Sequence, residues 1–173
     1  SDAVIKAKET IEKPVVYIPV FPGTNSEYDS AKAFEKEGAE VNLVPFVTLN
    51  EEAIVKSVET MVDNIGKANI LFFAGGFSAA DEPDGSAKFI VNILLNEKVR
   101  AAIDSFIGRG GLIIGICNGC QALVKSGLRP YGNFEDASST SPTRFCNDAN
   151  QDVAKMVETR IANTNSPWLT GVQ

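Results

Sequence analysis

The stretch "LIIGICNGCQALVKSG", residues 112–127, joins an aliphatic run to a helix-like pattern through a glycine-rich corner. The run up to Ile114 is typical of a short buried strand, and Gly127 is a typical helix stop. Between them stands Cys117, with one glycine two residues before it and another two residues after it. This spacing matches a strand–turn–helix elbow, which exposes a nucleophile at a sharp bend. We expect the following helix to direct its positive end towards the sulfur, which favours a thiolate.

Other interpretations of this corner stay open. Cys117 would be inert if the turn buried it among apolar side chains. Because "CNGC" is a C-x-x-C motif, Cys117 and Cys120 would suit a redox dithiol at a helix N-terminus. Alternatively, Cys120 is a small apolar residue on the inner side of the helix. A structural zinc site is disfavoured, because Cys146 is the only further thiol and the chain has no histidine.

The composition is that of one ordinary globular domain. The chain has 173 residues, of which 44% are hydrophobic and 22% charged. A net charge of −6 argues against nucleic acid or an anionic membrane as the main partner. No apolar run reaches the roughly 18 residues of a membrane span. The three cysteines do not suggest a disulfide framework, so we expect a reducing cytoplasm as the setting.

Aliphatic runs alternate along the chain with segments that have a helical pattern of apolar residues. Asn25 or Ser26 is expected to cap the first helix and Asn50 the second, and one or two helices are expected before Gly108. This alternation predicts an α/β fold with a mainly parallel central sheet. The predicted strands are 14–21, 40–46, 69–78, 111–116 and a final one at 153–163.

Three unusual loops follow predicted strands: "FPGTN" (21–25), "AGGFS" (74–78) and "GICNGC" (115–120). Because parallel strands all end at one edge of a sheet, we expect these loops to meet there. The glycines in the second loop would leave backbone N–H groups facing a ligand, and the N–H of Asn118 would face the same point. Together such donors stabilise an oxyanion beside a nucleophile, although each loop alone is an ordinary turn.

These residues carry a resemblance to class I, or triad-type, glutamine amidotransferase domains. Within that class the chain is most similar to the glutaminase domain of phosphoribosylformylglycinamidine synthases, enzymes of purine biosynthesis. The resemblance covers residues 14–173, with 1–13 as a leader or linker. It implies a flavodoxin-like three-layer sandwich that is truncated at its C-terminal end. The matching segments are "FPGTNSEYD" (21–29), "FFAGGFSAAD" (72–81), "GICNGCQAL" (115–123) and "SPTRF" (141–145).

The resemblance also implies a role for each matching residue. Cys117 would attack the side-chain amide of glutamine and form a glutamyl thioester. The N–H groups implied to hold the oxyanion are those of Gly75, Gly76, Phe77 and Asn118. The residues implied to bind the substrate are Gln121, Asn25, Gly23, Ser78 and Arg144.

The sequence departs from this class in one respect. The class completes its triad with a histidine and a glutamate in a "HGEG"-like segment, and these 173 residues contain no histidine. We therefore expect the chain by itself to be a poor catalyst. The ammonia would pass to a synthetase domain that uses ATP and magnesium to make formylglycinamidine ribonucleotide. No cofactor is expected in the glutaminase domain itself.

Two other functions remain open at this point. A flavodoxin-like cysteine hydrolase or peptidase would also use a cysteine elbow, but it would not explain "FPGTN" or Gln121. A non-catalytic interaction domain would have an unreactive Cys117.

Overall fold

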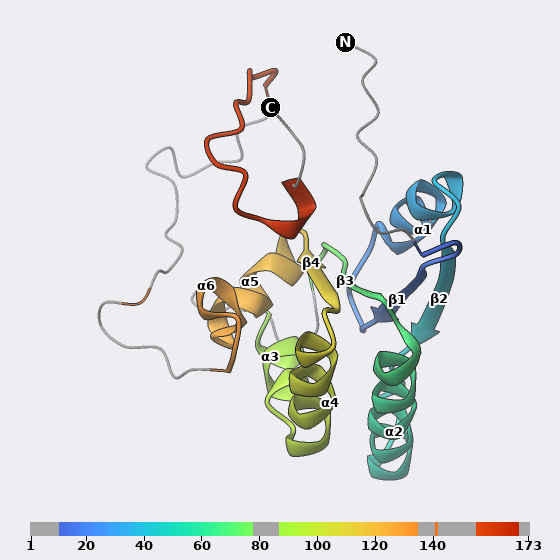
Figure 1. Ribbon diagram of the computed structural model, residues 1–173. Coiled ribbons are helices and arrows are strands. Elements are labelled where there is room, and N and C mark those ends of the chain that lie inside the picture. The colour runs from blue at the N-terminus through green and yellow to red at the C-terminus, as the bar shows by residue number, and fades with distance from the viewer. Residues whose placement is uncertain (1–10, 78–86, 135–140, 142–154, 170–173) are drawn as a thin grey trace. The chain divides into compact units, whose positions relative to one another are not determined.

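The computed structural model describes residues 11–77, 87–134, 141 and 155–169. The chain divides into two compact units, residues 13–143 and the two terminal segments 1–12 and 144–173. The larger unit holds the sheet and is coloured blue to orange in Figure 1. In the described part of the chain, the structure has no helix that combines the length and apolar character needed to cross a bilayer.

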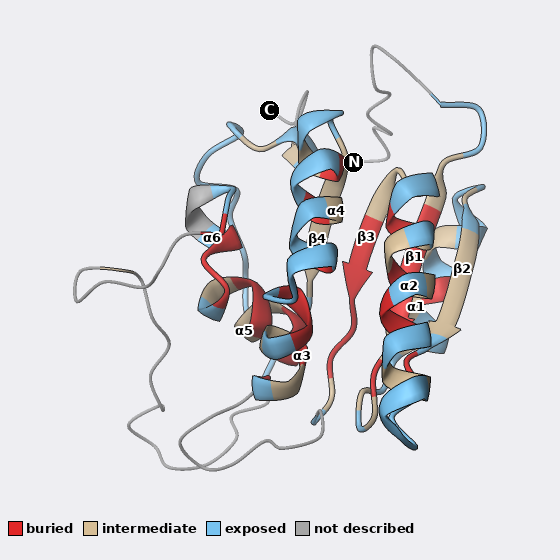
Figure 2. Cartoon of the chain, turned by 90° about the horizontal axis from the view of Figure 1, so that it is seen from below, coloured by how far each residue is buried: buried red, intermediate tan, exposed pale blue. Residues whose placement is uncertain are grey.

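Four parallel strands form the central sheet in the order β2-β1-β3-β4. The inner strands, β1 and β3, carry nearly unbroken runs of buried residues, as expected for strands covered on both faces (Figure 2). The first four predicted strands are confirmed, although the third and fourth end early because the chain bends into its glycine-rich loops. Their bounds are Val15–Val20 for β1, Glu40–Pro45 for β2, Ile70–Phe73 for β3 and Leu112–Gly115 for β4.

Helices connect the strands and cover both faces of the sheet (Figure 1). Asn50 caps α2 as predicted, because its Oδ1 accepts a hydrogen bond from the Ala53 N–H at 2.8 Å. Ser26 precedes α1, but its side chain makes no capping hydrogen bond. The helices of this unit are α1 Glu27–Lys36, α2 Glu51–Lys67, α3 Lys88–Leu94, α4 Glu97–Gly108, α5 Asn118–Lys125 and α6 Leu128–Tyr131.

The alternation of side chains along β1 divides the core between the two faces. Val16 and Ile18 point towards α1 and join a small cluster there, whereas Tyr17 points into the larger cluster. Burial raises the pKa of the Tyr17 hydroxyl above its usual range, which keeps the side chain neutral. The larger cluster is built from helices α2 to α5 and includes Met61, Ile65, Ile90, Ile103, Phe106 and Ala122. The unit is therefore a three-layer α/β sandwich.

The prediction of a final strand at 153–163 is wrong for its described residues, 155–163, which form neither strand nor helix. Their apolar side chains are exposed, with Met156 at 99% and Val157 at 63%. A strand needs a hydrogen-bonded neighbour, and this unit's only described regular element is the short 3₁₀ helix Pro167–Leu169. The predicted leader, 1–13, lies almost entirely outside the described residues.

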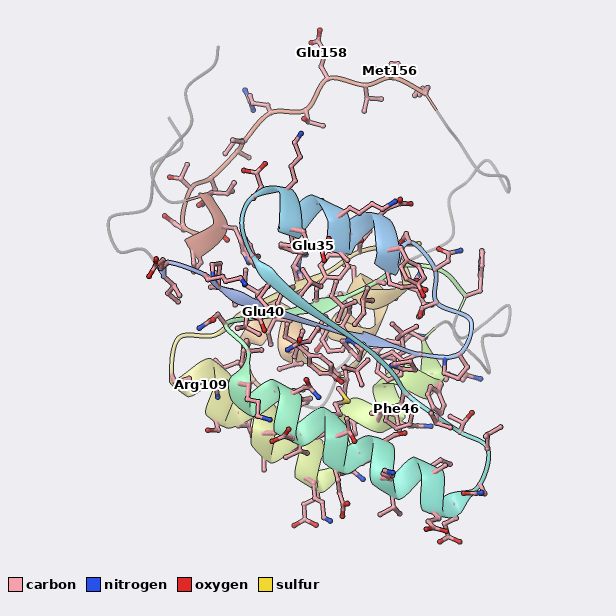
Figure 3. All side chains as sticks on the ribbon, turned by 90° about the vertical axis from the view of Figure 1, so that its right-hand side faces the viewer. Glu35, Glu40, Phe46, Arg109, Met156 and Glu158 are labelled. Carbon is pink, nitrogen blue, oxygen red and sulfur yellow. The ribbon has the colours of Figure 1, made fainter. Side chains whose placement is uncertain are left out.

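Arg109 joins the end of α4 to the end of α2. Its Nη2 donates hydrogen bonds to the carbonyl oxygens of Ile65, Gly66 and Ala68 at 2.6, 3.2 and 3.1 Å. Figure 3 shows Arg109 beside the ends of these two helices. Its guanidinium also lies 5.0 Å from the centre of the Phe106 ring. Carbonyls in the last turn of a helix lack intrahelical donors, so the arginine satisfies groups that would otherwise need water.

We predict that Arg109→Ala lowers the free energy of unfolding by about 1–2 kcal/mol, because charge-assisted hydrogen bonds and the ring contact are lost. Urea denaturation followed by circular dichroism measures this change. The control is Lys56→Ala on the exposed side of α2, which should change stability by less than about 0.5 kcal/mol. Equal effects of the two substitutions would contradict the proposed role of Arg109.

Candidate active site

Cys117 occupies a sharp turn between β4 and α5. Its backbone angles are φ 52° and ψ −111°, in a region that non-glycine residues rarely adopt. The turn is fixed on both sides, because Ile116 N–H donates to Phe73 O at 3.0 Å and Gln121 N–H donates to Cys117 O at 3.0 Å. Cys117 is itself exposed. The predicted elbow is therefore present, with its cysteine at the surface.

Two glycines allow α5 to begin directly against the sheet. A Cβ on Gly119 would overlap the carbonyl oxygen of Phe73 in β3. A Cβ on Gly115 would lie 2.8 Å from the Gly119 carbonyl carbon and from Leu123 Cδ1. Any side chain at either position would push the helix away from the strand ends. The close packing expected from the spacing around Cys117 is confirmed.

The two other loops are joined through their backbones. Asn25 N–H donates to Gly75 O at 2.9 Å, and Phe77 N–H donates to Gly23 O at 3.0 Å, around an isolated antiparallel bridge between Thr24 and Gly76. Gly76 has φ +116°, and a Cβ there would lie 2.6 Å from the Asn25 nitrogen. Only glycine fits this position, so it fixes the first loop against the second.

All three loops meet at Gly75. A Cβ built on Gly75 would lie 3.2 Å from Cys117 Cβ, 3.5 Å from Ile116 O and 3.8 Å from Ser26 Oγ. These atoms come from segments about forty to ninety residues apart in the sequence. The expected convergence at one edge of the parallel sheet is therefore confirmed.

The loop pairing distinguishes between the backbone donors suggested for an oxyanion hole. The Phe77 N–H is engaged with Gly23 O, whereas the N–H groups of Gly75 and Gly76 take no part in the bonds that join the loops. Asn118 begins α5 immediately after the cysteine. We therefore retain Gly75, Gly76 and Asn118 as the candidate donors and leave Phe77 out.

Gln121 lies one helical turn beyond the elbow and is partly exposed. Its Oε1 accepts a hydrogen bond of 3.3 Å from Nδ2 of Asn118, whose side chain is only 1% exposed. The buried amide therefore holds the orientation of the partly exposed one, on the same helix as Cys117. Of the other suggested substrate contacts, Asn25 and Gly23 lie in the first loop, whereas Ser78 and Arg144 fall outside the described residues.

Sequence reasoning missed three consecutive residues at the start of α1. Ser26, which was considered only as a helix cap, lies beside the contact between Gly75 and Cys117 and has φ +63°. Glu27 carries a buried carboxylate oxygen, Oε2, without a hydrogen-bond partner among the described residues. Tyr28 is 70% exposed. Their position directly after "FPGTN" was a signal that they lie near the site. The same residues were instead interpreted as the start of a helix.

Apolar side chains are exposed in two of these loops. Phe77 is 81% exposed and Ile116 is 50% exposed.

Among the side chains that the structure describes, no group of three or more histidine, cysteine, aspartate or glutamate residues is placed to hold a metal ion. The groups that the described residues bring to this edge include a thiol, a serine hydroxyl, backbone N–H groups and side-chain amides.

Comparison with known proteins gives consistent results. Residues 13–173 match the sequence model of the CobB/CobQ-like glutamine amidotransferase domain. The chain is 36% identical to phosphoribosylformylglycinamidine synthase subunit PurQ of Dehalococcoides mccartyi over 125 residues, which cover 70% of this chain and 43% of that protein. It is 30% identical to the PurQ subunit of Cereibacter sphaeroides over 151 residues, which cover 87% and 55%.

A solved structure, that of PurLQS from Thermotoga maritima, aligns with a TM-score of 0.47 and 28% identity, over 67% of this chain and 45% of that one. The chain spans about half the length of the curated relatives it matches.

We predict that Gly119→Ala lowers the free energy of unfolding by at least about 2 kcal/mol, because the added methyl group overlaps the Phe73 backbone. The matched control is Gly66→Ala in α2, where a Cβ meets nothing within 4 Å. That change should stabilise the protein by about 0.5–1 kcal/mol through helix propensity. Thermal and urea unfolding measure both changes, and a neutral Gly119→Ala would show that α5 does not need this close approach.

Proposed function

Because the chain belongs to the family of CobB/CobQ-like glutamine amidotransferase domains, we propose that it is a glutaminase with Cys117 as its nucleophile. The contact of three strand-end loops around the strained, exposed Cys117 is the observation that carries this proposal. A cysteine forced into an unfavourable backbone conformation is retained only where the surrounding structure fixes it.

In the proposed reaction, the Cys117 sulfur attacks the side-chain amide carbon of glutamine. A carbon–sulfur bond forms, and the amide oxygen takes up negative charge. The carbon–nitrogen bond then breaks, the amide nitrogen takes up the proton that the thiol gave up and leaves as ammonia, and a glutamyl thioester remains on Cys117. Water hydrolyses the thioester to glutamate and restores the thiol. Dividing the reaction into two steps is the advantage of nucleophilic catalysis.

The negative oxygen formed in the first step would be held by backbone donors. Gly75 supports this role because a Cβ there would come within 3.2 Å of Cys117 Cβ, so its lack of a side chain leaves the backbone open towards the cysteine. Gly76 and Asn118 complete the proposed set from the second loop and from the start of α5. Backbone donors fixed in advance are effective because they need no rearrangement as the charge develops.

Glutamine itself would be positioned by amides on either side of the nucleophile. Gln121 is oriented by Asn118, so its remaining hydrogen-bonding capacity is presented in a fixed direction. Asn25 and Gly23 approach from the first loop, which the bridge at Gly76 fixes in place. Ser78 and Arg144 complete the proposed substrate contacts on the basis of sequence alone.

The proposed partner is a synthetase that consumes the ammonia. PurQ relatives are named as subunits of phosphoribosylformylglycinamidine synthase, and we propose the corresponding role here. The synthetase would use ATP and magnesium to convert the formamide of formylglycinamide ribonucleotide to an amidine. The glutaminase step itself would need no cofactor.

The proposed mechanism also needs a base for the Cys117 proton. In triad-type enzymes this base is a histidine, and these 173 residues contain none. A general base contributes typically about 10²–10⁴-fold to a rate. We therefore propose that these residues form the nucleophile and its oxyanion site but do not supply the base.

We predict that a diazo-ketone analogue of glutamine labels Cys117 covalently and that excess glutamine slows the labelling. The reason is that the analogue occupies the proposed substrate site and presents its reactive carbon to the sulfur. Peptide mass spectrometry identifies the labelled residue. Cys117→Ser should abolish labelling, whereas Cys146→Ser should leave it unchanged.

Labelling of Cys120 or Cys146 in place of Cys117 would refute the assignment. A peptidase would differ in being labelled by peptidyl electrophiles and in being insensitive to free glutamine.

We further predict slow turnover. Ammonia released from glutamine by this chain should be about 10²–10⁴-fold below that of a PurQ relative, because no histidine accepts the thiol proton. A coupled ammonia assay on both proteins at equal concentration measures the ratio. Full activity of the 173 residues would mean that another group acts as the base.

A further inference from the structure

One feature of the elbow has no role in the proposed reaction, namely the second cysteine of "CNGC". Cys120 is partly exposed. Its sulfur accepts a contact of 4.0 Å from Nη1 of Arg129, an exposed side chain of α6. Other residues of α5 form its buried side. The suggestion that Cys120 is only a small apolar residue on that inner side is therefore wrong.

Cys120 lies in α5 and Cys117 directly precedes its first turn, and neither is among the buried positions of this helix. The buried positions are Asn118, Gly119, Ala122 and Leu123, which leaves the cysteines and Gln121 at least partly exposed. Residues three apart on a helix are neighbours. The sharp turn does not separate the cysteines, because the hydrogen bond from Gln121 N–H to Cys117 O closes the first helical turn around them.

The covalent geometry of a disulfide fits this spacing. Its Cα atoms are usually about 4.4–6.8 Å apart, and one helical turn advances only about 5.4 Å. Gly119, between the cysteines, is fixed against Phe73, so the backbone between the two thiols is held in one conformation. Both cysteines are thiols in this structure. Two reduced thiols therefore stand one hydrogen-bonded turn apart along the backbone.

We propose that Cys117 and Cys120 form a reversible disulfide when the protein meets hydrogen peroxide, with Cys120 as the resolving cysteine. Thiolate character and solvent access make a cysteine sensitive to oxidation, and a neighbouring thiol captures the sulfenic acid before it oxidises further. The disulfide would switch off the nucleophile and protect it. This effect on activity rests on the proposed glutaminase function, whereas formation of the bond does not.

The steps balance with peroxide as the only oxidant. The Cys117 thiolate attacks one peroxide oxygen, a sulfur–oxygen bond forms, the oxygen–oxygen bond breaks, and hydroxide leaves. The Cys120 sulfur then attacks the Cys117 sulfur, a sulfur–sulfur bond forms, and the sulfenic oxygen leaves as water with the thiol proton. Two thiols are oxidised by two electrons and one peroxide is reduced to two waters. A dithiol reductant restores both thiols by exchange.

The test is peroxide treatment of the whole chain followed by mass spectrometry of the intact protein and of its peptides. The treated wild-type protein should become lighter by two hydrogen atoms, with the bond mapped to Cys117 and Cys120, and dithiothreitol should reverse the change. Cys146→Ser is the matched control and should behave like the wild type. Cys120→Ser should instead give a Cys117 sulfenic acid that a 1,3-dione traps and that excess peroxide converts to the sulfinic acid.

Labelling by the diazo-ketone analogue of glutamine measures whether the disulfide blocks the nucleophile. Oxidised wild-type protein should lose nearly all labelling of Cys117 and recover it with dithiothreitol, whereas overoxidised Cys120→Ser should not recover. Thiols that stay reduced, a bond to Cys146, or sulfinic acid in the wild type would each overturn the proposal. If untreated protein is not labelled, the glutaminase function fails, and the mapped bond still decides the redox proposal.

Discussion

The contact between Gly119 and the Phe73 backbone is the constraint on which the geometry of this site depends. A helix can begin this close to a strand only where its second residue has no side chain. With α5 held against the end of β3, the chain leaving β4 has no room for a gradual turn. Cys117 therefore takes a positive φ, and its side chain reaches the surface. The strain at the cysteine follows from packing one turn away.

Glycines, which have no side chain, also allow the other two loops to approach Cys117. Gly76 lets residues 23–25 pair through backbone bonds alone, and Gly75 lets the pair approach the cysteine. Backbone contacts of this kind are short and rigid, so they fix donors more accurately than flexible side chains do. They also leave the apolar side chain of Phe77 pointing away from the joined loops and into solvent.

An exposed thiol is open to oxidation. The turn that presents Cys117 to a substrate also presents it to oxidants, because both need access to the same sulfur. Cys120, one turn further along the chain, is also partly exposed and lies next to Arg129, outside the core. In the proposed scheme, the short helix that positions the nucleophile also contains Cys120, which protects the nucleophile from further oxidation. The inner residues of that helix are buried, and one of them, Asn118, orients Gln121.

The sequence by itself determined the parallel α/β fold, the Asn50 cap and the cysteine elbow, because the patterns that indicate each of them are local along the chain. It also predicted that the three loops would meet, since parallel strands end at a common edge. Only the tertiary structure placed Ser26 beside Gly75, engaged the Phe77 N–H with Gly23 and brought Arg129 to Cys120. It also showed that residues 155–163, the described part of the expected final strand, form neither strand nor helix. These outcomes depend on which atoms come into contact after folding, and a local sequence pattern does not contain that information.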